Sequence, residues 1–315
     1  MPNSGETTSS SALTVVIPAT DHPATLERCL DALRACSDPP EQIVVVTEPP
    51  LAGPAAARNS GVEAAEHELI VFVDADVAVH PDALSRLRDL FDARPELVAA
   101  FGSYDDAPDD LGTVSRFRNL LHHHVHSSNA GPAETFWAGL GAIRRAALIE
   151  HGGFDEQRFA KPSVEDIELG MRLRAAQAPI VLDPSVRGAH LKRWTLVSMT
   201  RTDFAQRGVP WLRLQLESDS TSTALNLSLR NRAAALASVA LAGALLGRRP
   251  RLTLAALGAV LALNAPFYRL LARRGGPPLL LAGVALHVIH NLTAVAAVPV
   301  ALAQHLAQSR ASGRS

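Results

Sequence analysis

The feature that most constrains the fold is an apolar run that ends abruptly at two carboxylates. Residues 69–73 read Leu-Ile-Val-Phe-Val, and Asp74 and Asp76 follow them, one residue apart. Such a run predicts a buried strand, and open α/β sheets bind ligands at the carboxyl ends of their strands. Carboxylates are suitable ligands for the Mg²⁺ or Mn²⁺ that accompanies a diphosphate. The pattern favours a nucleotide-linked substrate, although two acids here can also cap the helix that begins at Pro81 and Asp82.

Strands and helices alternate around this run. Further apolar strands are expected at 13–17, 43–46, 97–102 and 180–182. Helical periodicity or small-residue composition predicts helices at 24–35, 55–65, 82–93 and 164–176. Because each strand is nearly all apolar and helices separate them, the sequence predicts an α/β fold with a mainly parallel sheet covered on both faces.

Charge is distributed unevenly along the chain. The 30 Lys and Arg residues nearly balance the 31 Asp and Glu residues, which is typical of neither a nucleic-acid binder nor a disordered chain. Residues 233–306, however, contain no acid. Their apolar runs at 233–247, 252–272 and 278–302 approach or exceed the roughly 20 residues that a membrane-crossing helix needs. The first run is short and has arginines at both ends, so it is also compatible with a re-entrant or interfacial segment.

These patterns divide the chain into four parts: a disordered tail at 1–11, a catalytic domain at 12–195, a basic amphipathic interface segment at 196–219 and a membrane domain of about three helices at 229–307. The tail lacks the basic and apolar regions of a signal peptide, so the catalytic part is expected in the cytoplasm, on a multi-pass protein of the cell membrane. Cys29 and Cys36 have no further cysteine partners, which favours ordinary thiols over a disulfide or metal site.

Several short motifs occur in a fixed order along the first two thirds of the chain. They are Val16-Ile17-Pro18, the segment 53–61, Asp74-Ala75-Asp76, Trp137-Ala138-Gly139, the segment 152–156 and the segment 164–170. In this order and spacing they resemble the family 2 glycosyltransferases, inverting enzymes of the GT-A fold that are often membrane-attached. The resemblance runs from about Leu13 to Trp211. It implies a GT-A nucleotide-binding fold followed by C-terminal transmembrane helices.

The resemblance implies a donor site for a nucleotide-sugar. Its expected residues are Pro18, Asp21, Glu48, Arg58, Asn59, Asp74 and Asp76. Glu48 stands where the family usually has two aspartates, one of which holds the base. Arg58 and Asn59 open a helix and could donate to a diphosphate, although a solvated arginine is the alternative. The divalent cation, Mg²⁺ or Mn²⁺, is expected on Asp74, Asp76 and His190.

The resemblance also implies the catalytic residues. Inversion at the anomeric carbon needs a general base on the face opposite the leaving diphosphate, and the family pattern assigns this role to Asp166. Glu165 would position Asp166 or contact the acceptor. Both acids could also serve only as charges at a helix start. The expected acceptor or diphosphate region consists of Trp137, Gly139, Lys192, Arg193 and Trp194.

Two histidine groups remain. The run at 122–126 has no nearby cysteine and its histidines point in different directions, so a place in the acceptor cleft is favoured over zinc. His287, His290 and Asn291 share one helical face, and packing against Asn264 and Pro266 is expected for them.

The sequence therefore predicts an inverting glycosyltransferase of hexosyltransferase type with a lipid-linked or membrane-proximal glycan acceptor, in contact with membrane lipids and without a nucleic-acid partner. The few spans favour single or limited sugar addition. One alternative is a nucleotidyltransferase, which would carry a Gly-rich phosphate loop after the first strand. Another is a non-catalytic membrane scaffold, which has no chemical reason to keep all three acids at 74, 76 and 166.

Overall fold

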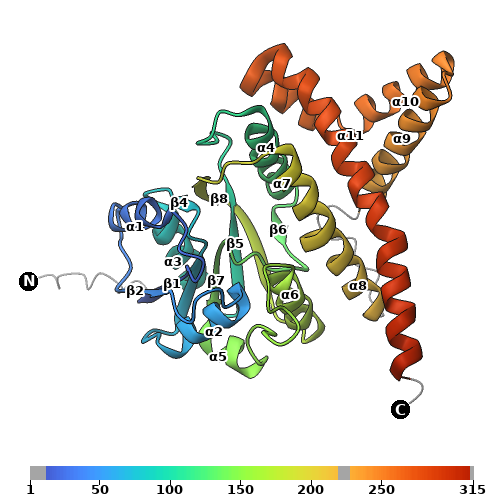
Figure 1. Ribbon diagram of the computed structural model, residues 1–315. Coiled ribbons are helices and arrows are strands. Elements are labelled where there is room, and N and C mark those ends of the chain that lie inside the picture. The colour runs from blue at the N-terminus through green and yellow to red at the C-terminus, as the bar shows by residue number, and fades with distance from the viewer. Residues whose placement is uncertain (1–11, 219–227, 313–315) are drawn as a thin grey trace, which may run out of the picture. The chain divides into compact units, whose positions relative to one another are not determined.

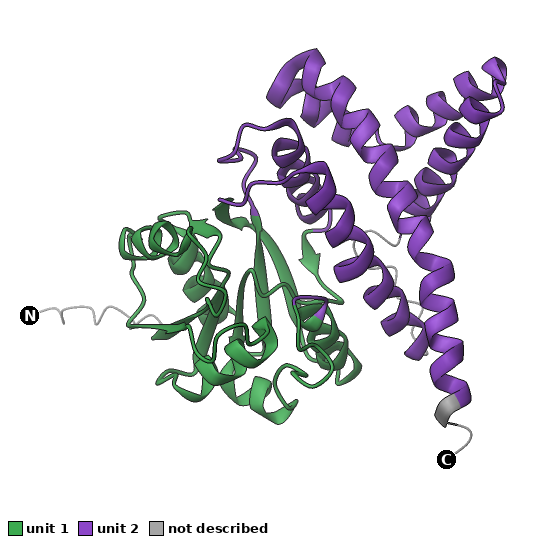
Figure 2. Ribbon diagram, viewed as in Figure 1, with its two compact units in different colours: residues 1–103, 130–161, 165–190 green, residues 104–129, 162–164, 191–315 purple. Residues whose placement is uncertain are grey.

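The computed structural model describes residues 12–218 and 228–312 (Figure 1). The tail expected at 1–11 lies outside the described residues, as does residue 219. The chain divides into two compact units (Figure 2). Unit 1 comprises residues up to 103 together with 130–161 and 165–190, and unit 2 comprises 104–129, 162–164 and the residues from 191 onward.

Unit 1 is built on a sheet that, within the described residues, has eight strands in the order β2-β1-β3-β7-β5-β8-β4, with β6 paired to β8. The strands are β1 (Leu13–Pro18), β2 (Gln42–Val46), β3 (Leu69–Val73), β4 (Val77–Val79), β5 (Ala99–Tyr104), β6 (Gly131–Pro132), β7 (Leu140–Arg144) and β8 (Ile180–His190). β1 is parallel to β2 and β3, whereas β7 is antiparallel to β3 and β5. β8 is antiparallel to β4 and β6.

The expectation of a mainly parallel sheet was therefore wrong, and the sheet is mixed. An apolar strand shows that both of its faces are buried, but its composition does not encode the direction in which it runs. β3 has all five of its residues buried, and its antiparallel neighbour β7 is almost as apolar. The α/β class itself is confirmed.

Five helices accompany the sheet in the described part of unit 1: α1 (Leu26–Arg34), α2 (Pro54–Glu63), α3 (Ala83–Ala93), α5 (Arg145–Glu150) and α6 (Glu165–Ala175). Pro54 begins α2 directly after its N-cap Gly53, a position that tolerates the missing N–H of proline. Within α2, a Cβ on Gly61 would lie 2.2 Å from a Val16 methyl carbon. The small residue therefore lets α2 approach β1 closely.

The helices of unit 2 are α4 (Thr113–Ser127), α7 (Leu196–Arg201), the π-helix η1 (Thr202–Gly208), α8 (Val209–Glu217), α9 (Leu229–Leu246), α10 (Pro250–Leu263) and α11 (Ala265–Ser312). α7 begins with a capping box in which Thr195 and Ser198 each bond the backbone N–H of the other. In the described residues, α9 and α11 are long and apolar enough to cross a membrane, while α10 is shorter.

The apolar run at 252–272 does not form the single helix expected for it. α10 ends at Leu263, and Asn264 leaves the helical region with φ −115° and ψ 16°. Residues 265–272 instead begin α11, which continues through a kink at Gly276, where φ is 65°. Glycine suits this backbone conformation because it has no Cβ.

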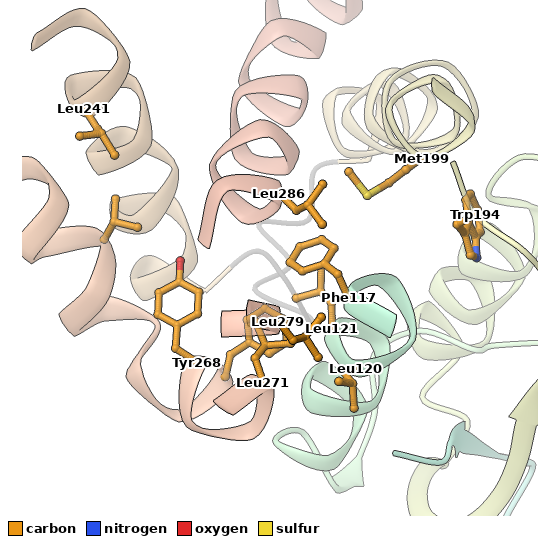
Figure 3. Close-up of a cluster of buried hydrophobic side chains, with 12 residues drawn as sticks. Phe117, Leu120, Leu121, Trp194, Met199, Leu241, Tyr268, Leu271, Leu279 and Leu286 are labelled. Carbon is orange, nitrogen blue, oxygen red and sulfur yellow. The ribbon is translucent and has the colours of Figure 1, made fainter. Parts of the chain in front are cut away.

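The core of unit 2 is a cluster of buried side chains from α4, α7, α9, α10 and α11 together with Trp194 (Figure 3). Among its members, Phe117, Phe267 and Leu271 are almost completely buried. Aromatic rings meet edge to face here, with 5.7 Å between the ring centroids of Phe117 and Phe267.

Candidate functional site

The Asp-x-Asp motif forms the turn between β3 and β4. Asp74 directly follows β3, and the N–H of Val77 donates to the carbonyl of Asp74 at 2.9 Å, which closes the turn. The strand is fully buried, whereas the side chains of Asp74 and Asp76 are 32% and 24% exposed. The turn thus brings two partly accessible carboxylates to the carboxyl end of β3.

His190 lies beside this turn because β4 pairs with the end of β8. Val77 is opposite His190 in the antiparallel register, and the Nε2 atom of His190 lies 3.6 Å from Oδ2 of Asp76. The strand expected at 180–182 was too short, because β8 continues through Pro184 and Gly188 to His190. This added length carries the imidazole to the motif.

The pair formed by Asp76 and His190 fits two ligands of one divalent cation. A carboxylate oxygen and an imidazole nitrogen are both suitable donors for Mn²⁺. Within the described residues, however, no group of three or more His, Cys, Asp or Glu side chains is placed to hold an ion. The third expected ligand, Asp74, uses Oδ1 to accept from Arg58. A cation on Asp76 and His190 would therefore need further oxygens, which a donor diphosphate or water supplies.

Arg58 links the motif to the start of α6. Its guanidinium donates to Oδ1 of Asp74 at 2.8 Å and to Oε1 of Glu165 at 2.9 Å, and the side chain is only 4% exposed. The cationic group also lies 5.4 Å from the centroid of the Phe154 ring, within the range of a cation–π interaction. Arg58 thus neutralises one acid that follows it by 16 residues and another that follows it by 107 residues.

The charges in this group shift one another's pKa values. Burial alone would lower the pKa of Arg58, but the neighbouring Asp74 and Glu165 outweigh it and raise the pKa above its usual range. Removal from water raises the pKa of Asp74, and the like charge of Asp76 adds to this effect, while Arg58 acts in the opposite direction. Arg58 therefore favours the ionised state of Asp74 in a crowded set of acids.

The first turn of α6 holds Glu165 and Asp166 differently. Glu165 is buried at 5% exposure and bound to Arg58. Asp166 is partly exposed; its Oδ2 accepts from the backbone N–H of Ala138 at 3.2 Å, and its Oδ1 accepts from the N–H of Ile167 at 2.8 Å. Of the two acids, Asp166 is the more accessible.

A short peptide connects Asp166 to the Asp-x-Asp motif. Ala138 donates to Asp166, and the carbonyl of the next residue, Gly139, accepts from the backbone N–H of Asp74 at 3.0 Å. A Cβ on Gly139 would lie 2.5 Å from the indole ring of Trp137. Glycine is thus required for the partly exposed Trp137 ring to lie over this backbone.

The remaining predicted donor residues lie at the ends of β1 and β2. The backbones after these strands are bonded to each other, by Ala19 N–H to the Val46 carbonyl and Leu51 N–H to the Thr20 carbonyl, each at 2.9 Å. Pro18 ends β1 and is partly exposed, while the side chains of Asp21 and Glu48 are exposed. These two acids are therefore accessible on neighbouring loops.

Asn59 has a structural role that the amino-acid sequence around it did not predict. Its Nδ2 donates to the carbonyl of Phe154 at 2.8 Å, and its Oδ1 accepts from the N–H of Phe154 at 2.9 Å. These two bonds hold the segment after Gly153, which has a φ of +66°. The amide of Asn59 and the guanidinium of Arg58 are therefore both engaged inside the protein, and donor binding by them stays a prediction.

Three of the predicted acceptor or diphosphate residues belong to unit 2, which begins again directly after His190. Trp194 is buried at 7% exposure and donates its backbone N–H to Oγ of Ser115 at 2.8 Å. The Nζ atom of Lys192 lies 4.8 Å from the centroid of the Trp194 ring. Arg193 is exposed, with Nε 4.0 Å from a carboxylate oxygen of Asp110.

The histidines at 122–126 lie on α4 in unit 2. The rings of His122 and His126 are 3.9 Å apart between centroids, and His124 stacks on Phe267 at 5.4 Å. Nδ1 of His123 lies 2.9 Å from the carbonyl of Tyr104. Within the described residues they form no metal-binding group, and packing accounts for these contacts.

Cys29 lies beneath the site. Its Sγ is 3.7 Å from the carbonyl oxygen of Asp74. Burial, together with the charges of Asp74 and Asp76, raises the pKa of the Cys29 thiol to about 12. Both Cys29 and Cys36 are buried free thiols, as expected from the sequence, and neither has the lowered pKa of a nucleophile.

Comparisons with known proteins agree with this geometry. Residues 40–152 match the model of Glycosyl transferase family 2. A pre-mycofactocin glycosyltransferase of Mycobacterium tuberculosis is 29% identical over 207 residues, which cover 58% of this chain and 43% of the relative. The same protein from a second strain matches equally. The match thus spans less than half of those relatives.

A solved structure shows the same fold. A mannosyltransferase from Pyrobaculum calidifontis, determined in complex with GDP-Man and Mn²⁺, superposes with a TM-score of 0.54 at 19% identity. The superposition covers 95% of this chain and 88% of the mannosyltransferase. At this identity the likeness concerns the fold, which is the GT-A type of mixed α/β sheet. The chain is therefore similar to Glycosyl transferase family 2 over residues 40–152 and has the GT-A fold.

Proposed function

We propose that this protein transfers a sugar from a nucleotide-diphosphate donor to an acceptor hydroxyl with inversion at the anomeric carbon. The observation that carries the proposal is the peptide at 137–139, which is bonded to Asp166 on one side and to Asp74 on the other. An inverting transfer needs a base and a diphosphate site that face one reacting carbon from opposite sides. A rigid link between the two acids fits this need.

In the proposed reaction Asp166 is the general base. Its carboxylate takes the proton of the acceptor hydroxyl as that oxygen bonds to the anomeric carbon, while the bond from this carbon to the donor diphosphate breaks. The backbone N–H groups of Ala138 and Ile167 hold both oxygens of the Asp166 carboxylate in place. Glu165 acts as a positioning residue through Arg58, since this pair holds the first turn of α6 against the end of β3.

The donor site in this proposal uses residues that follow β1, β2 and β3, together with His190 at the end of β8. Asp21 and Glu48 would contact the nucleoside, and Asp76 with His190 would hold Mg²⁺ or Mn²⁺ beside the diphosphate. Such a cation neutralises charge on the departing diphosphate. Trp137 offers a partly exposed ring on which a sugar could stack. The mannosyltransferase with GDP-Man and Mn²⁺ supports a donor and metal of this kind.

We further propose that the acceptor is lipid-linked or lies close to a membrane and that the protein is attached to that membrane. The support is the apolar composition of α9 and α11. The sequence alone favours a multi-pass arrangement with a cytoplasmic catalytic domain; this stays a prediction, with a monotopic arrangement as its alternative.

The proposal is tested by separating donor binding from turnover in the full-length protein. A panel of nucleotide-sugars first identifies the donor by the release of nucleoside diphosphate. Asp166→Asn should then keep the donor affinity within a few fold and lower the turnover by roughly 10²- to 10⁴-fold, the usual contribution of a general base. Near-normal turnover in this variant would remove Asp166 from its role. Release of inorganic diphosphate instead would favour a nucleotidyltransferase.

A further inference from the structure

Along its length, α11 makes polar contacts with charged side chains of other parts of unit 2. Three polar contacts mark its beginning, middle and end: Arg274 with Asp106, His290 with Asp203 at 2.7 Å, and Gln308 with Arg213 at 2.8 Å. Between these contacts α11 packs against α4, η1 and α8. If α11 crossed a membrane, these charged partners would have to lie within the roughly 30 Å of the hydrocarbon core, where charged groups are costly.

The middle contact includes a buried ion pair. The side chain of Asp203 is 4% exposed; its Oδ1 accepts from Nη2 of Arg118 at 2.8 Å, and its Oδ2 lies 2.7 Å from Nδ1 of His290. Despite its burial, the pKa of Asp203 is lowered to about 2, chiefly because Arg118 faces it. His290 on α11 therefore faces an ionised carboxylate, and its expected packing against Asn264 and Pro266 stays a prediction.

The other polar residues of this α11 face also have defined partners. Nδ1 of His287 lies 3.2 Å from the hydroxyl of Tyr268, and Nδ2 of Asn291 donates to Oγ of Ser238 on α9 at 3.0 Å. Further along, Ala297 packs against Val209 at the start of α8. Side chains of η1, α9 and α8 thus contact one face of α11 from His290 to Ala297.

The α9–α10 hairpin has a different surface. Eight of its large apolar side chains are at least 39% exposed: Leu229, Leu236, Val239, Leu245, Leu246, Leu252, Leu254 and Leu261. The longer α11 has four such side chains. In α10 only Val260 is buried. Leu246, at 87% exposure, is the most exposed of these apolar residues.

The shortness of α10 and the charges of the hairpin argue against a crossing. With about 1.5 Å per residue, the 14 residues of α10 span about 21 Å, well below the roughly 30 Å of the hydrocarbon core. The 18 residues of α9 span about 27 Å, but its first turn carries Arg230 and Arg232. Arginines also flank both ends of the hairpin: Arg230 and Arg232 at its base and Arg248, Arg249 and Arg251 at its tip. Basic residues resist translocation, which favours both ends on one membrane face.

We infer that the protein is monotopic: the α9–α10 hairpin lies in the plane of one leaflet with its leucines among the acyl chains, and α11 does not cross. The arginines at both ends of the hairpin then contact anionic headgroups, as in helices that lie along a bilayer surface. This inference rests on the membrane attachment of the proposed function and is independent of its catalytic part.

A labelling experiment on the full chain tests the topology. In a Cys29→Ala/Cys36→Ala background, single cysteines are placed by Arg248→Cys at the hairpin tip, by Ser309→Cys near the end of α11 and by Arg201→Cys in α7 as the reference. Sealed inverted membrane vesicles are treated with a membrane-impermeant maleimide. All three positions should react from the outside. If Ser309→Cys reacted only after detergent was added, α11 would cross the membrane; the same result for Arg248→Cys would make the hairpin a crossing one.

A second experiment tests what covers the hairpin. Leu246→Asp/Leu254→Asp should move the full-length protein from membranes to the soluble fraction by at least tenfold, whereas Leu302→Asp/Leu306→Asp on α11 should leave its distribution unchanged. Circular dichroism in detergent checks that both variants fold. Loss of membrane binding only in the α11 variant would overturn the inference. If the hairpin variant stayed on membranes but changed from dimer to monomer in detergent, the leucines would contact a second copy.

Discussion

Arg58 is the residue whose loss should disturb the site most, because two acids depend on it. In Arg58→Met the methionine keeps much of the side-chain volume but removes the cation. Glu165, with 6% of its side chain exposed, is then a buried charge without its counter-ion, while Asp74 at 32% exposure retains access to water. Breaking a buried ion pair from one side costs about 3–5 kcal/mol. We expect about 3 kcal/mol, because the exposed half of the triad is screened.

Such a loss corresponds to a decrease in Tm of about 6–12 °C for a domain of this size, measured by circular dichroism in detergent. The matched control is a second substitution in the Arg58→Met background. Glu165→Gln removes the buried carboxylate that has lost its counter-ion and should restore at least half of the lost free energy of unfolding. Asp74→Asn should restore less, because Asp74 is more exposed. A decrease in Tm below about 2 °C, or equal recovery from both second substitutions, would refute the reasoning.

Three further predictions concern single residues. Asp76→Asn and His190→Gln should each weaken Mn²⁺-dependent donor binding, measured by calorimetry. The control, Asp82→Asn at the exposed start of α3, should leave this binding unchanged. Equal donor affinity of the unmodified protein in excess chelator would contradict the metal assignment. Gly139→Ala should lower turnover by at least tenfold because its Cβ meets the Trp137 ring at 2.5 Å, whereas Gly243→Ala, with nothing within 4 Å of its Cβ, should be neutral or stabilising. The pKa of Asp203 is lowered to about 2, so the ionised Asp203 should stabilise the protein fully above about pH 4 and lose this effect as the pH falls toward 2. Asp203→Asn should therefore flatten the dependence of Tm on pH in that range. An unchanged slope would contradict the ionised state of Asp203.

The sequence predicted the elements of unit 1 well because strand and helix periods are local properties. The run at 69–73 is β3 with the same bounds, and Asp82 directly precedes α3, as its turn residues indicated. Strand direction was not predictable, since it depends on which strands become neighbours. The length of β8 was missed because Pro184 and Gly188 are typical of a loop, yet this strand carries His190 to Asp76.

The roles of polar side chains were harder to predict than their positions. Arg58 and Asn59 were expected to face the donor because their motif opens a helix, but their partners are Asp74, Glu165 and the backbone of Phe154. These contacts join residues up to 107 positions apart, and no local pattern encodes them. The apolar runs likewise predicted helices but not the break at Asn264.

The central claim, an inverting transfer with Asp166 as base, is tested most directly by the configuration of the product. Once the donor is identified, water can replace the acceptor, and proton NMR of the first turnovers reports the anomer that is released before mutarotation. The account predicts that the free sugar first forms with the anomeric configuration opposite to that of the donor, and that Asp166→Asn slows its formation. First release of the anomer with the donor's own configuration would contradict a single displacement and require a covalent or front-face route.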